Sequence, residues 1–62
     1  MGNVVLHYDK RTGDWHTDHN GHHYMIEHGS VGYNVHRDDE GIYTHMFAET
    51  LKLAREYIAC DK

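Results

Sequence analysis

Apolar and polar residues alternate in short runs over most of the chain. Near the carboxyl end, the apolar residues recur every three or four positions. Val4, Leu6 and Tyr8 stand two residues apart, which is the pattern of a half-buried β-strand. Turn-forming stretches separate this run from later ones, among them DKRTGD at 9–14 and DDEG at 38–41. The pattern predicts four or five short antiparallel strands, joined in order as a meander.

An Asn-Gly pair at 20–21 is the strongest turn signal in the sequence. This dipeptide is preferred in two-residue type I′ hairpin turns, because both residues accept positive φ. Counting outward from the turn pairs Asp18 with His23 and Trp15 with Ile26. Since successive strand residues point to opposite faces, Trp15 and Ile26 are expected to face the core. Asp18 and His23 are then expected to face solvent.

The apolar spacing becomes helical near the carboxyl end. Phe47, Leu51, Ala54 and Ile58 recur at intervals of four, three and four residues, which places them on one helical stripe. We therefore predict a helix over about 47–60, laid on one face of a sheet that spans about residues 3–46. The expected fold class is α+β, an antiparallel meander with one carboxyl-terminal helix.

Length and cysteine content restrict the kind of protein. With 62 residues there is room for a single domain over residues 1–62. Cys60 is the only cysteine, so an internal disulfide is excluded and a reducing compartment is favoured. No stretch of ~18 apolar residues occurs, as a membrane span would need. We expect a cytoplasmic protein.

Negative charge is concentrated in the amino-terminal part of the chain. The formal net charge is −4, and residues 1–40 carry seven of the ten acidic groups but three of the six basic ones. Such a surface repels phosphate, which argues against direct nucleic-acid binding and favours a basic protein surface as partner. The residues expected to bind that partner are Asp14, Asp18, Glu27, Asp38, Asp39 and Glu40.

Histidine is unusually frequent, with eight residues, four of them in WHTDHNGHHY at 15–24. The hairpin register places His16, Asp18 and His23 on one face, and two imidazoles with a carboxylate can ligate zinc, nickel or iron. The same groups could act as a general acid and base, or form the polar outer face of a hairpin. Because so small a sheet can hardly enclose a pocket, we expect no enzyme activity. We expect no cofactor, with zinc or another transition metal as the alternative.

A second apolar flank widens the stripe of the predicted helix. At ~100° per residue its members cluster beside that stripe, and a small sheet can cover only part of so wide an arc. An exposed shoulder of this kind could meet a second copy, giving a homodimer. The residues of this predicted self-association surface are Met46, Leu53, Tyr57 and Cys60.

Two stretches, GYNV at 32–35 and TLKLAREYI at 50–58, resemble the closing strand and helix of small sheet-plus-helix modules. The resemblance is to the arm-type DNA-binding domain of tyrosine integrases and to the HicB-type antitoxin domain. The chain lacks the basic strands of the first, and DDEG at 38–41 stands where the second has Pro-Asp-Leu-Pro-Gly. No functional residue is carried over from either family.

In size, charge and lack of catalytic motifs, the chain is similar in type to short phage-encoded inhibitors, the anti-CRISPR and host-takeover proteins. The function expected from the sequence is that of a small acidic, non-enzymatic protein-binding module that inhibits a basic nucleic-acid-binding protein complex. The alternatives are a histidine-rich metal-binding module and an antitoxin-like component of a toxin-antitoxin pair.

Overall fold

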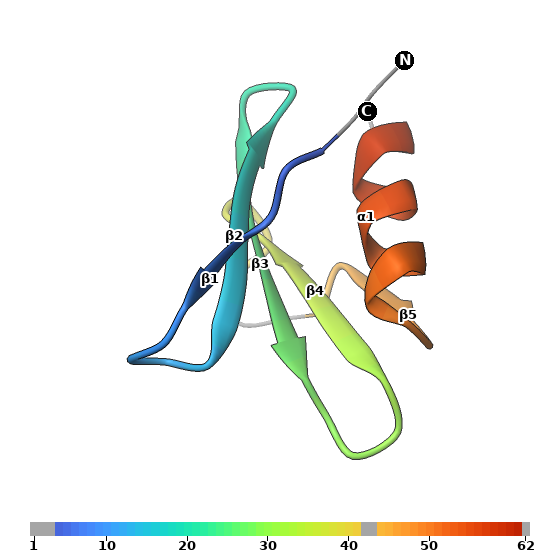
Figure 1. The fold of residues 1–62 in the computed structure, drawn as a ribbon. Coiled ribbons are helices and arrows are strands. Elements are labelled where there is room, and N and C mark those ends of the chain that lie inside the picture. Colours follow the sequence, from blue (N-terminus) through green and yellow to red (C-terminus); the bar gives the residue numbers. More distant parts are fainter. Residues whose placement is uncertain (1–3, 42–43, 62) are drawn as a thin grey trace.

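A computed structural model describes residues 4–41 and 44–61. Five antiparallel strands form one sheet in the order β1-β2-β3-β4-β5, and a helix, α1, follows (Figure 1). The elements are β1 (His7–Asp9), β2 (Asp14–His19), β3 (His22–His28), β4 (Tyr33–Arg37), β5 (Met46–Ala48) and α1 (Leu51–Cys60). The α+β meander with a carboxyl-terminal helix is confirmed, with five strands.

The hairpin between β2 and β3 has the register that the Asn-Gly pair predicts. Asn20 and Gly21 both adopt positive φ, 54° and 84°, as a type I′ turn requires. Trp15 pairs with Ile26, and the four pairs between them and the turn also match the count from the turn. Trp15 and Ile26 therefore point to the side on which the core lies.

The boundary between sheet and helix was predicted wrongly. Residues 46–48 form β5, paired with β4, so Phe47 lies on a strand and is 47% exposed instead of opening the helical stripe. The helix begins at Leu51 because Thr50 adopts an extended backbone and caps it. The Thr50 hydroxyl oxygen accepts a hydrogen bond of 3.1 Å from the Leu53 N–H. The four-residue spacing between Phe47 and Leu51 is therefore not helical, because Phe47 lies on β5 and Leu51 is the first residue of α1.

Gly32, the residue before β4, leaves room for β5. A Cβ on Gly32 would lie 2.5 Å from Cζ of Phe47 and 2.8 Å from the carbonyl oxygen of Ala48. The aromatic ring therefore lies where a larger residue at position 32 would stand. The sheet was expected to end at about residue 46, but β5 spans Met46–Ala48 and so continues it to residue 48; residues 42 and 43 lie outside the described residues.

The core lies between the sheet and α1, which packs against β4 and β5 (Figure 1). The segment that precedes β1 adds Val4, which is buried although it is not part of a strand. The buried apolar residues are Val4, Tyr24, Ile26, Val35, Ala48, Ala54 and Ile58. Among residues 4–41 and 44–61, no helix is long and apolar enough to cross a membrane.

Truncating the helix anchor should destabilise the fold severely. Ile58 is 0% exposed, and removing a buried isoleucine side chain down to Cβ costs about 2–5 kcal/mol. A domain of this size has roughly 3–5 kcal/mol to lose. We expect Ile58→Ala to lower the urea midpoint sharply, or to unfold the chain, in a denaturation curve followed by circular dichroism.

Val31→Ala is the matched control, because Val31 is 81% exposed and should change stability by about 0.5 kcal/mol or less. Equal urea midpoints for the Ile58→Ala variant and the wild type would contradict the packing of α1 described here.

Candidate functional site

One face of the sheet packs on α1, and the other, here called the uncovered face, does not. Because side chains alternate along each strand, the register assigns the residues of this face without ambiguity. They are His7, Asp9, Asp14, His16, Asp18, His23, Met25, Glu27, Asn34, His36 and Phe47. Four are imidazoles and four are carboxylates, and none of these described strand positions is a lysine or arginine.

The three predicted metal ligands come together on this face as a hydrogen-bonded chain. Asp18 Oδ1 lies 2.9 Å from His23 Nδ1, and His23 Nε2 lies 3.0 Å from His16 Nδ1. The two imidazole rings are inclined by 29° with centroids 5.2 Å apart, so they meet edge to edge through these nitrogens. Asp18 thus contacts the nitrogen of His23 that faces away from His16. The carboxylate therefore holds one ring in place, while the two imidazoles face each other.

The hydrogen bonds indicate which nitrogen of His23 carries a proton. A carboxylate accepts hydrogen bonds, so His23 Nδ1 is the donor toward Asp18. In a neutral imidazole, Nε2 then keeps its lone pair and accepts a hydrogen bond from Nδ1 of His16. The pair accordingly presents two ring nitrogens that share a single hydrogen.

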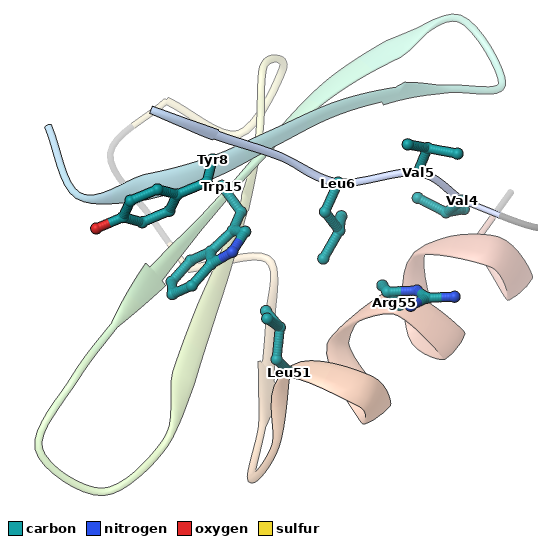
Figure 2. Close-up of a pocket in the computed structure, with 7 residues that line it drawn as sticks. All are labelled: Val4, Val5, Leu6, Tyr8, Trp15, Leu51 and Arg55. Atoms are coloured by element: carbon teal, nitrogen blue, oxygen red, sulfur yellow. The ribbon is translucent and has the colours of Figure 1, made fainter. Parts of the chain in front are cut away.

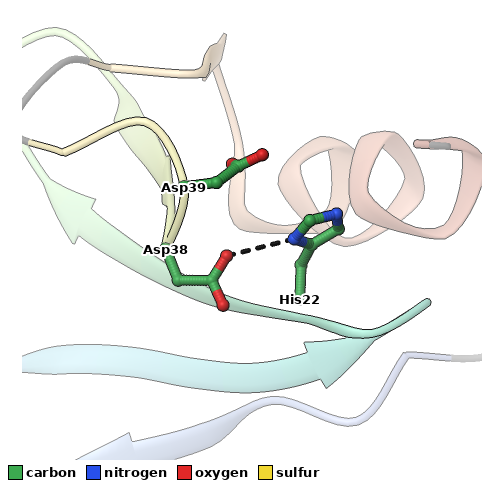
Figure 3. A group of neighbouring side chains, drawn as sticks. All are labelled: His22, Asp38 and Asp39. Carbon is green, nitrogen blue, oxygen red and sulfur yellow. Dashed lines mark hydrogen bonds and ion pairs between the residues drawn. The ribbon is translucent and has the colours of Figure 1, made fainter.

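A second group of possible metal ligands lies where the start of β3 meets the turn after β4 (Figure 3). Ligand atoms of His22, Asp38 and Asp39 there lie within 4.8 Å of one another. Asp38 bonds both the His23 backbone N–H and the His22 ring, each at 3.1 Å, and these contacts lower its pKa in that order. Arg37 Nε, 2.6 Å from Asp39, lowers the pKa of that carboxyl. The guanidinium beside Asp39 opposes binding of a further cation.

The predicted partner-binding carboxylates fall into two groups. Asp14, Asp18 and Glu27 lie on the uncovered face. The 38–40 turn follows β4, and its carboxylates have partners within the chain: Glu40 lies 3.5 Å from Arg37 Nη2, just as Asp38 and Asp39 contact His22 and Arg37. The turn therefore offers less unpaired negative charge than its composition indicates.

A charged network that the sequence did not signal connects the end of α1 to the sheet. One carboxylate oxygen of Asp61 accepts a hydrogen bond from the Tyr24 hydroxyl at 2.5 Å, and lies 3.0 Å from Arg37 Nη1 and 3.1 Å from His45 Nε2. Burial opposes ionisation of Asp61, but these hydrogen bonds outweigh it and lower its pKa. Burial and then the Asp61 carboxylate raise the pKa of Tyr24.

A groove lies between the amino-terminal segment, the first strands and α1 (Figure 2). Its volume is about 370 Å³, and its wall is largely apolar, with Val5 and Tyr8 65% and 55% exposed. The lining residues are Val4, Val5, Leu6, Tyr8, Trp15, Leu51 and Arg55. Sequence periodicity did not identify this groove, because it depends on how segments far apart in the chain pack together.

The predicted self-association residues do not form one flank of the helix. Met46 lies on β5 instead, because the helix begins only at Leu51, and it packs against the core together with Leu53. Tyr57 and Cys60 are the exposed members, and both lie on α1. Self-association through these residues stays a prediction.

No protein-family model, curated protein or solved structure matches this chain.

The Asp61 network should make folding stability sensitive to acid. A carboxyl whose native pKa is lowered contributes stability that is fully present above its unfolded value, 3.8, and is lost as the pH falls through the native pKa. We expect Asp61→Asn to cost about 1–3 kcal/mol at neutral pH, as loss of hydrogen bonds to a charged group does. The variant should also lose less stability than the wild type below pH ~4.

Urea denaturation at a series of pH values between about 2 and 7 measures both effects. Glu56→Gln, at an exposed position of the same helix, controls for the loss of one negative charge. Parallel acid-unfolding curves for Asp61→Asn and the wild type would rule out a contribution from this network.

Proposed function

We propose that this chain is a non-enzymatic protein-binding module that uses the uncovered face to bind a basic protein surface. The observation that supports the proposal is the composition of that face, with four carboxylates and neither lysine nor arginine at its described strand positions. A face of one sign attracts a partner of the other sign and speeds their encounter.

The shape of the site favours a macromolecule over a small substrate. Its imidazoles and carboxylates stand on an open sheet five strands wide, whereas catalytic groups ordinarily sit in a concave and partly dry pocket. Imidazoles, a partly buried Met25 and the exposed ring of Phe47 can contact a partner through both polar and apolar atoms.

Asp14 and Glu27 are the carboxylates best placed for this role. Asp39 and Glu40 contact the Arg37 guanidinium, whereas Glu27 contacts the His36 ring, 3.4 Å from its Nε2, and this ring carries no permanent charge. A basic partner that binds nucleic acid would lose access to phosphate when its cationic surface is covered. Inhibition of such a complex, in the manner of the phage anti-CRISPR and host-takeover proteins, is the activity that we propose for this binding. An antitoxin-like component would use the same chemistry.

Neutralising the uncovered face should weaken partner binding. We expect the double variant Asp14→Asn, Glu27→Gln to bind its partner about five- to tenfold more weakly, since exposed ion pairs contribute ~1 kcal/mol or less each. The wild-type chain serves to capture the partner from its native host for identification by mass spectrometry. Affinities of the purified pair are then measured at low and high salt.

The matched control is Glu49→Gln, Glu56→Gln, which removes the same charge from exposed positions outside the sheet. It should bind as the wild type does. A partner whose affinity is insensitive to salt and unchanged in the Asp14, Glu27 variant would refute the proposal.

A further inference from the structure

The His16 and His23 imidazoles form a two-nitrogen arrangement that a metal ion can enter. Nδ1 of His16 and Nε2 of His23 lie 3.0 Å apart and share one hydrogen. An ion can bind both nitrogens when His16 takes its other neutral tautomer, in which the hydrogen leaves Nδ1 and a solvent proton is taken up at Nε2, so that no net proton is released. Both rings are accessible, since His23 is exposed and His16 is half-buried on the uncovered face.

The two nitrogens face each other across a hydrogen bond of 3.0 Å. An ion can bind both lone pairs once the rings turn so that both nitrogens point to one place, and the exposed His23 ring has room to do so. The hydrogen-bond length does not select one ion, because nickel(II), copper(II) and zinc(II) all accept imidazole nitrogens.

We propose that the uncovered face carries a site for one divalent transition-metal ion of this kind, with His16 Nδ1 and His23 Nε2 as ligands. Asp18 is the orienting partner: its carboxylate accepts the Nδ1–H of His23 and so leaves Nε2 free to bind. Metal-binding histidines usually have such a partner, which fixes both the tautomer and the ring position. Asp18 therefore acts through His23 and does not itself ligate the ion.

His7 is placed to supply a third nitrogen. It pairs directly with His16 across β1 and β2, so both side chains leave the same face from neighbouring strands. Directly opposed residues have Cβ atoms about 5 Å apart, and the His7 side chain is exposed and able to rotate. Rotation of this ring toward His16 completes a three-nitrogen site, with water at the remaining positions.

The other histidine-carboxylate group competes poorly for the same ion. In that group, Asp39 is already bound to the Arg37 guanidinium through two hydrogen bonds, of 2.6 and 3.0 Å. The positive charge of Arg37 would have to be displaced or opposed by an incoming ion. No cationic side chain contacts His16, Asp18 or His23 among the described residues.

The test is calorimetric titration of the tag-free chain with nickel(II) and, separately, with zinc(II). We expect one equivalent of nickel to bind, and zinc to bind at the same two histidines. His16→Ala and His23→Ala should each weaken nickel binding at least tenfold, and Asp18→Ala about tenfold through loss of the orienting carboxylate. His7→Ala should weaken it less than either ligand variant. His28→Ala, at an exposed histidine at the far end of β3, should leave the affinity unchanged.

A flat titration would overturn the proposal. Nickel binding that persists in the His16→Ala, His23→Ala double variant would also overturn it. So would a loss of nickel affinity in His28→Ala as large as that in His16→Ala or His23→Ala. A second measurement does not depend on variants: substoichiometric copper(II) should first broaden the backbone amide NMR signals of His16 and His23. Broadening that begins at His22 and Asp38 would place the ion at the other group and refute the site.

Discussion

The tight reversal of the chain at Asn20 and Gly21 is the constraint on which the rest of the structure depends. Because both residues hold positive φ, the turn admits one register between β2 and β3. A slip of one residue would turn every side chain of a strand to the opposite face. Either Trp15 of β2 or Ile26 of β3 would then leave the core, and the imidazole pair would be divided.

With that register set, two surfaces of different character result from one sheet. The inner face buries a small core, in which Ile26 of β3 and Val35 of β4 lie opposite each other and Ile58 comes from the helix. The Asp61 network then holds the end of α1 to the strands, through Tyr24 and Arg37. Polar groups at this edge are satisfied by one another, which a core of this size requires.

The uncovered face combines charge with imidazole chemistry, and different residues carry the two proposals. Attraction of a basic partner depends on carboxylates without cationic neighbours, such as Asp14. Metal binding depends on two ring nitrogens 3.0 Å apart, held by a carboxylate that is itself 84% exposed. Loss of one property therefore does not entail loss of the other.

Local patterns were enough to predict the meander, the hairpin register, the shared face of His16, Asp18 and His23, and burial of Ile58, since turn chemistry and side-chain period act between near neighbours. The same patterns misplaced Phe47. Residues 46–48 pair with β4 as a strand, and the Thr50 cap starts the helix at Leu51, but neither feature changes the spacing of the apolar residues. Asp61 lies 37 residues from Tyr24 in the chain, and its contacts depend on packing that no local signal encodes. The 3.0 Å approach of two imidazoles likewise depends on side-chain rotamers chosen within the folded sheet.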